Sequence, residues 1–158
     1  MKSIGPETPY GYTIFCDDIR REIGNKISFV GIYIGSINLH KSLPFQFPKF
    51  GFAITYCERS GESTEPVTLR IFLPGEDEEN PFIKSELPVE QLRNQEPPQD
   101  KDTKDPILTC NIQIVAQPMI IKANGLIKVR AYRGDLEIRL GTILVKCEEP
   151  LEQALLAS

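Results

Sequence analysis

Three carboxylates near the start of the chain are the side chains whose types and spacing could do chemistry. Asp17, Asp18 and Glu22 lie close together, with Arg20 between them. Carboxylate oxygens bind divalent cations, and two of them can also act as a general acid and base. The alternative is structural, because polar side chains exposed at a β-bulge form cross-strand ion pairs of about 0.2–1 kcal/mol each. We favour the structural interpretation of this polar cluster and assign no catalytic residue and no metal ligand.

The residues and motifs that other kinds of catalysis require are missing from the sequence. Activation of a serine or cysteine nucleophile usually requires a histidine, and the single histidine, His40, lies in a loop-like segment. No Gly-x-Ser-x-Gly elbow is present, and Gly31 to Gly35 lacks the Lys-Ser/Thr ending of a phosphate-binding loop. The sequence therefore leans away from an enzyme and predicts no cofactor.

The four cysteines predict buried thiols rather than a metal site. Cys16, Cys57, Cys110 and Cys147 lie far apart, and each falls within an apolar, strand-like run. A zinc site would bring its cysteines in closely spaced pairs. Free cysteine is among the most buried residue types in reducing compartments.

Basic residues near the C-terminus alternate along one predicted strand. Lys128, Arg130 and Tyr132 are expected to point outward, with Arg139 on the neighbouring strand. Arginine beside an aromatic ring can bind nucleic acid, but Glu137 lies among these residues and the pI is near 5.1. We therefore expect a solvated sheet face and no nucleic-acid partner.

Two apolar features suggest contact with other proteins. Phe45 and Phe47 lie beside two prolines just before a strand, where they either plug the core or form an aromatic anchor for a partner. Leu151 and Leu155 lie on one edge of a predicted helical tail, which is too short to be stable alone. These four residues are the candidate interface.

The elements that must position these residues are strands. Gly24-Asn25 separates two apolar runs and is typical of a tight hairpin turn, as is Gly134-Asp135 near the end of the chain. The alternation changes phase at Asp17-Asp18 and again after Gly141-Thr142, which predicts a β-bulge at each place. Period-two patterns predict strands over residues 12–23, 26–34, 50–56, 67–73, 108–114, 126–132 and 136–147. We expect an all-β fold, an antiparallel β-sandwich of about 7–8 strands of immunoglobulin-like or related Greek-key type.

The length of 158 residues fits one domain, 1–158, with two unusual segments. Residues 75–106 form an acidic, proline-rich excursion with ten acidic and four basic residues, and residues 149–158 form the helical tail. The acidic run from Glu76 to Glu79 is interpreted as solvated, because it lacks the ligand spacing of a calcium loop. The N-terminus lacks the apolar run of a secretory signal, and no stretch approaches the roughly 18 apolar residues of a membrane helix. The protein is therefore expected to be cytoplasmic, with no membrane partner.

Two segments resemble a known family. IFCDDIRREIGNKISFVGIY, residues 14–33, resembles the opening motif of a family of small uncharacterised bacterial proteins that carry a domain of unknown function. VRAYRGDLEIRLGTI, residues 129–143, is similar to the closing hairpin of that family. The resemblance implies a bacterial single-domain protein and brings no activity or ligand.

The hypothesis from sequence is a non-enzymatic protein-binding or assembly module that self-associates or binds another protein. The alternative is a metal-dependent hydrolase or a calcium-responsive binding domain that uses Asp17, Asp18 and Glu22.

Overall fold

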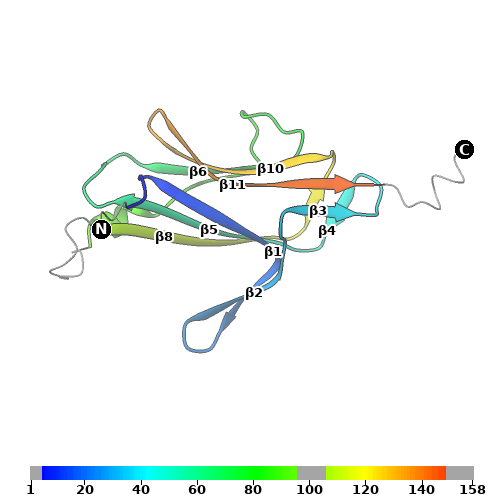
Figure 1. The fold of residues 1–158 in the computed structure, drawn as a ribbon, viewed down its shortest axis with the longest axis horizontal. Coiled ribbons are helices and arrows are strands. Elements are labelled where there is room, and N and C mark those ends of the chain that lie inside the picture. The colour runs from blue at the N-terminus through cyan, green and yellow to red at the C-terminus, as the bar shows by residue number, and fades with distance from the viewer. Residues whose placement is uncertain (1–4, 96–105, 149–158) are drawn as a thin grey trace, which may run out of the picture.

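The computed structural model describes residues 5–95 and 106–148, and these form an all-β sandwich (Figure 1). The one helix among them is short, α1 (Val89–Arg93). The strands are β1 (Tyr10–Glu22), β2 (Lys26–Ile32), β3 (Ser36–Leu39), β4 (Phe45–Phe47), β5 (Phe50–Arg59), β6 (Val67–Phe72), β7 (Ile83–Glu86), β8 (Ile107–Ala116), β9 (Met119–Ile121), β10 (Gly125–Arg133) and β11 (Leu136–Cys147).

The strands form two large sheets and one small one. Sheet A has the order β2-β1-β5-β8, sheet B has the order β3-β11-β10-β6-β7, and β4 pairs with β9. Every pair is antiparallel except β11 with β3, which is parallel. The predicted sandwich is confirmed, and the short strand β3 adds one parallel pairing at the edge of sheet B.

Alternation along the strands fills the space between the two sheets. On β5, Phe52, Ile54 and Tyr56 point inward, and their neighbours on β8 belong to the same core. Sheet B contributes the inward-facing Leu69 and Val129, both fully buried. Burial of a side chain of this size contributes about 1.5–3 kcal/mol, so these alternating rows supply the main stabilisation of the fold.

The described residues contain more strands than the 7–8 predicted. The additional ones, β3, β4, β7 and β9, are each three or four residues long. A period of two cannot be recognised over so few residues. For β3, β4 and β9 the pairing partners are also distant in sequence, so the tertiary structure decides their conformation.

Both predicted hairpins are present, and one of the two predicted bulges is confirmed. At the end of the chain, Val129 pairs with Gly141 and Arg130 with Arg139, which leaves Leu140 as an extra residue on β11. At the start of the chain the register of β1 with β2 runs without an inserted residue. The bulge predicted at Asp17-Asp18 is therefore wrong, and the phase change there has another cause, described below.

The acidic excursion contains ordered structure. Its first part forms β7 at the edge of sheet B and α1 beside it. Leu87 and Val89 are buried in the core, which explains why apolar residues interrupt this acidic segment. Residues 96–105 and the predicted helical tail, 149–158, lie outside the described residues. The part of the chain that is described contains no helix long and apolar enough to cross a membrane.

Candidate functional site

The carboxylates of the polar cluster each have different neighbours. Asp18 accepts a hydrogen bond from the backbone N–H of Ile19 and lies 3.4 Å from Arg20 and 3.9 Å from Lys49. Glu22 pairs with Lys26 in the last pair before the hairpin turn. Asp17 accepts a hydrogen bond from the hydroxyl of Tyr33. The cluster is thus distributed along the hairpin and does not surround a common point.

Gly31 explains the phase change that the sequence showed near Asp17. Gly31 has a φ of +66°, in the left-handed region that favours glycine. A Cβ placed on Gly31 would clash with the Asp17 carboxylate, so Asp17 packs directly over this glycine. Next to them, the pKa of Tyr33 is raised by burial and by its hydrogen bond to Asp17. The glycine, the carboxylate and the phenol therefore lie in contact with one another where the pattern changes phase.

Within residues 5–95 and 106–148, no group of three or more His, Cys, Asp and Glu side chains could hold a metal ion. The four cysteines are buried and free, as the sequence predicted. Burial raises the pKa of the Cys16, Cys110 and Cys147 thiols, and this disfavours the reactive thiolate.

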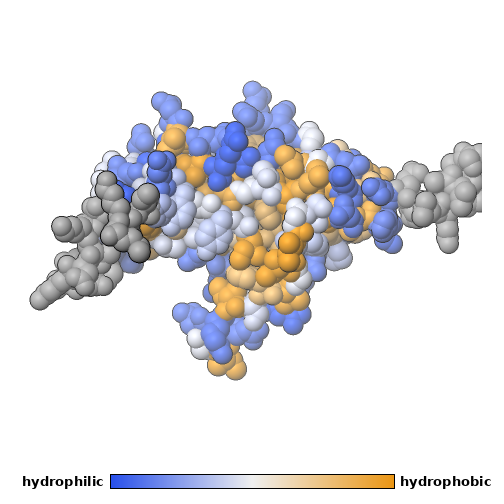
Figure 2. Space-filling model, in the orientation of Figure 1, coloured by the Kyte–Doolittle hydropathy of each residue, from blue (hydrophilic) through white to orange (hydrophobic). Residues whose placement is uncertain are grey.

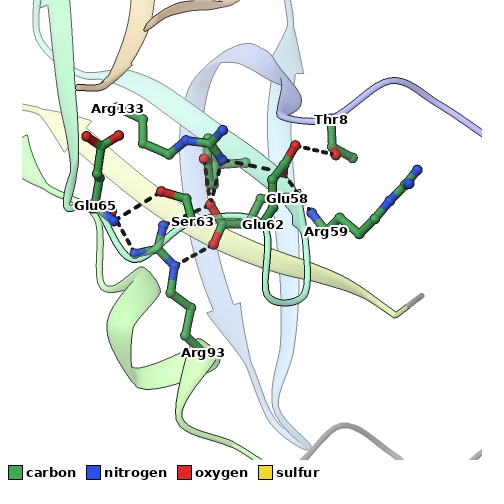
Figure 3. A network of polar contacts seen from close by, with 9 residues as sticks. Thr8, Glu58, Arg59, Glu62, Ser63, Glu65, Arg93 and Arg133 are labelled. Carbon is green, nitrogen blue, oxygen red and sulfur yellow. Dashed lines mark hydrogen bonds and ion pairs between the residues drawn. The ribbon is translucent and has the colours of Figure 1, made fainter. Parts of the chain in front are cut away.

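The most buried charged group lies at one end of the sandwich (Figure 3). Glu58 is 1% exposed and lies 2.5 Å from the Nε of Arg93 and 3.2 Å from the Nη1 of Arg133. The hydroxyl of Tyr56 donates a further hydrogen bond to the same carboxylate, at 2.9 Å. Arg93 also donates to the backbone carbonyl of Glu65.

This network joins separate elements and leaves no open ligand position on Glu58. Arg93 comes from α1, Arg133 from β10 and Glu58 from β5. Each carboxylate oxygen already accepts hydrogen bonds from at least one of these arginines. The geometry is that of a clamp which fixes α1 to the end of the sandwich.

The candidate aromatic interface is divided between core and surface. Phe47 is buried and its ring packs edge-on against Phe50 and Phe45. Phe45 is partly buried against the same core. The placement of Phe47 matches the core-plug alternative, so an exposed aromatic anchor at this site would have to come from Phe45. Leu151 and Leu155 lie outside the described residues.

The outer face of sheet A has an unusual composition, with exposed side chains on β1 and β8 and buried ones along the central strand β5. Cross-strand rows on this face are Tyr10–Cys57–Thr109, Tyr12–Thr55–Asn111, Ile14–Ala53–Gln113 and Cys16–Gly51–Val115. None of these positions is charged, although charged residues make up 25% of the chain. Interface cores are depleted in charge and enriched in tyrosine.

The β1–β2 hairpin extends this surface with apolar side chains and one arginine, Arg21. It projects away from the two sheets, and Figure 2 shows hydrophobic surface where it leaves the body and at its tip. Ile19 pairs with Phe29, and Arg21 with Ile27, so these four share one face of the hairpin. A shallow hollow of about 260 Å³ separates Ile27 and Phe29 from the outer face of sheet A. We call this face of sheet A and the hairpin together the apolar surface.

The outer face of sheet B is charged instead. Lys84, Arg70, Arg130 and Arg139 form one continuous row across β7, β6, β10 and β11. Like charges directly opposite on neighbouring strands destabilise a sheet. Among the described residues, Glu137 lies within ion-pair distance of Arg130 and Arg139.

The loop between β6 and β7 brings further acidic residues to the basic row. Glu78 and Glu79 line one hollow together with Arg70 and Lys84, and Glu76 lines a second hollow beside Arg130. Arg70 also stacks over the ring of Tyr132, with its guanidinium carbon 4.7 Å from the ring centre. This neutralisation makes the charged face a weaker candidate for a ligand site than the apolar surface.

Sequence patterns identified parts of both surfaces but not their extent. Thr109, Asn111 and Gln113 were visible as the polar side of one strand. The absence of charge at the positions of β1 and β5 in the same four rows becomes a pattern only when the register aligns them. The Glu58 network joins residues far apart in the sequence, and no local spacing indicates it.

The comparisons with known proteins give a family and no activity. The sequence model of a family described as a family of unknown function (DUF6941) matches residues 11–146. This match covers most of the chain, from the first strand to the end of the last hairpin. No curated protein and no solved structure gives a significant match.

Proposed function

The chain belongs to the DUF6941 family of unknown function, and because membership brings no activity, we propose from its surface that it is a non-enzymatic protein-binding module. The observation that carries the proposal is the absence of charge from four successive cross-strand rows on the outer face of sheet A, which end at Arg59. Exposed polar surface without charge is cheap to desolvate, since burying an unpaired ion costs far more than burying an amide or hydroxyl.

The hairpin supports the same function. Of its exposed apolar residues, Ile23 is 95% exposed, and Ile34, just after β2, is 90% exposed. Contiguous apolar surface on a folded domain marks a contact site for another macromolecule more often than a solvated face. The apolar surface therefore provides both parts of a protein interface, an apolar centre and a neutral polar rim.

The proposed cellular location and the proposed kind of partner both come from the sequence analysis. We propose that the module acts in the bacterial cytoplasm, where its buried free cysteines stay reduced. Its partner is a protein, including a second copy of the chain, rather than a nucleic acid or a membrane.

A charge placed on the apolar surface tests the proposal. Val115→Glu introduces a carboxylate at a residue of sheet A that is 37% exposed, and Leu126→Glu does the same at a 41% exposed residue outside this surface. Tagged full-length variants are compared in extracts of the native host, with quantitative mass spectrometry of the proteins retained. The proposal predicts a protein that is retained by the native chain and by Leu126→Glu and lost with Val115→Glu. Equal retention by both variants would contradict it.

A further inference from the structure

β2 is an edge strand whose free side is not protected. It lies at the end of sheet A, and only β1 pairs with it among the described residues. Natural edge strands avoid pairing with other chains by carrying lysines, prolines or bulges, or by being covered. β2 contains a single lysine, Lys26, and no proline, and its hairpin extends away from the body of the protein (Figure 1).

We propose that the free edge of β2 pairs antiparallel with β2 of a second copy of this chain, around a two-fold axis at Ser28. This inference rests on the proposed function and names the partner. Backbone N–H and C=O groups along a strand edge are complementary to another strand, and a two-fold axis lets the same surface satisfy both copies.

The register of the hairpin makes its apolar face complementary to itself. An axis at Ser28 places Ile27 directly opposite Phe29 of the second copy. Because Ile19 pairs with Phe29 within each hairpin, Ile19 and Phe29 of one copy then form an apolar row with Ile27 of the second copy. The two-fold axis produces this row a second time. Cross-strand apolar pairs of this kind are the main source of sheet stabilisation.

The same axis makes the polar face complementary in charge. Glu22 pairs with Lys26, and Asp18 with Val30, on the opposite side of each hairpin. In the proposed pair, Lys26 lies opposite Val30 of the second copy. Asp18 of the second copy is the next residue in this row, on β1, because it pairs with that Val30. Adjacent strands are about 4.8 Å apart, so the long lysine side chain can extend over Val30 toward this carboxylate.

Neighbouring axes give poorer pairings. An axis at Phe29 would place Ile27 opposite Gly31, which has no side chain. An axis at Ile27 would place Phe29 opposite Asn25, which lies in the hairpin turn with a φ of +57°. The axis at Ser28 also brings the tip of each hairpin, with the exposed Ile23, toward Ile32 and Ile34 of the other copy.

The first test measures the oligomeric state of the full-length chain by sedimentation equilibrium over a range of concentrations. The expected result is a reversible monomer–dimer equilibrium. Ile27→Glu is compatible with the monomer, since Ile27 pairs with Arg21, but it places a carboxylate beside Phe29 of the second copy. The dimer dissociation constant should rise at least about tenfold, because the change is repeated at both symmetric contacts. Ile120→Glu, on β9, is the matched control, since the two isoleucines are 41% and 42% exposed.

A second test remains informative if Ile27→Glu is unstable. Ser28→Cys places a thiol at the proposed axis, within reach of its counterpart in an antiparallel pair. Mild oxidation should give a disulfide-linked dimer, because the native cysteines are buried. Ser85→Cys, an exposed position on the edge strand β7 of sheet B, should give no such dimer.

The outcomes separate this inference from the proposed function. A monomer at every concentration, or a dimer insensitive to Ile27→Glu with equal crosslinking of both cysteine variants, overturns the second copy as partner. If such a chain still retains a host protein in a manner sensitive to Val115→Glu, the proposed function stands without the dimer. Selective crosslinking at Ser28 together with a dimer weakened by Ile27→Glu supports both.

Discussion

At the scale of single residues, Glu58 is the most deeply buried charged position among the described residues. Its carboxylate is buried between Arg93 and Arg133. Glu58→Gln would leave both guanidinium groups facing a neutral amide, and removal of one partner from a buried ion pair destabilises a protein by about 3–5 kcal/mol. Chemical denaturation of the two proteins measures this loss in the free energy of unfolding.

Glu62 provides a matched control for that substitution. It lies 3.4 Å from Arg133, but its side chain is 26% exposed. Glu62→Gln should therefore reduce the free energy of unfolding by less than about 1 kcal/mol, in the range of surface ion pairs. A similar decrease in the free energy of unfolding for both variants would show that the buried position of Glu58 does not make its ion pairs more stabilising than those of Glu62.

The same carboxylate should make stability depend on acid. Burial opposes its ionisation, but hydrogen bonds from Arg93 and Tyr56 outweigh burial and lower the pKa of Glu58 below its ordinary value of 4.5. The unfolded chain therefore binds this proton more readily than the folded chain. The stabilisation is present above about pH 4.5 and is lost as the pH falls through the folded-state pKa.

Denaturation of the native chain and of Glu58→Gln over this acidic range measures the effect. The difference in stability between the two proteins should shrink as the pH decreases, since Glu58 is then protonated in both states. A difference that stays constant with pH would exclude Glu58 as the titrating group.

Sequence analysis identified the residues of the first hairpin but not the buried clamp, and the reason is physical. Asp17, Asp18 and Glu22 attract attention because they are close in sequence, yet their contacts are separate. Glu58 and its partners Arg93 and Arg133 meet only after β5, α1 and β10 have packed. Local spacing carries no information about such a contact.

At the scale of the elements, the bend of the β1–β2 hairpin depends on one glycine. Gly31→Ala would place a side chain in the left-handed region, which costs roughly 1–2 kcal/mol, and would also push against Asp17. Gly35→Ala separates the two effects, because Gly35 has a φ of +79° with open space around its Cβ position. The free energy of unfolding should fall for both variants, and further for Gly31→Ala.

An additional change at Asp17 tests the cause of the difference. Asp17→Ala in the Gly31→Ala background should recover the part of the loss that comes from the contact, but not the part from the backbone. Equal losses for Gly31→Ala and Gly35→Ala would mean that packing of Asp17 over the glycine does not stabilise the bend.

Elements were predictable where a repeating pattern was long enough to recognise. The last hairpin and its bulge followed from the alternation and from Gly134 and Gly141. At the first hairpin, the same kind of phase change arises from a left-handed glycine on the opposite strand, and the sequence pattern does not distinguish the two causes. The short strands, such as β3 beside β11, depend on tertiary pairing.

At the scale of the whole molecule, the two sheets present opposite surfaces. The outer face of sheet A has four successive cross-strand rows without charge, and that of sheet B carries the row of Lys84, Arg70, Arg130 and Arg139. The sandwich class was predictable from alternation, since the inward positions are apolar in nearly every strand. The asymmetry between the outer faces was not, because it depends on which strands become neighbours.

This asymmetry predicts that salt acts mainly on the sheet B side. The loop between β6 and β7, the green loop above β10 in Figure 1, carries Glu78 and Glu79 to the hollow beside Arg70 and Lys84. Such partly solvated attractions contribute up to about 1 kcal/mol and are screened when the Debye length falls to about 3 Å, near 1 M salt. The double variant Glu78→Gln/Glu79→Gln should therefore release the loop at low salt.

Hydrogen-exchange mass spectrometry of the peptide covering residues 74–82 measures this release. Exchange should be several-fold faster in the double variant than in the native chain at low salt, and the two rates should converge at high salt because screening removes the attraction in the native chain. Glu90→Gln, an exposed position on α1, provides the control and should leave exchange in this peptide unchanged. If hydrogen exchange in the native chain did not respond to salt, the loop would be held by its backbone turns. Glu78 and Glu79 would then not offset the repulsion between the basic side chains of the row.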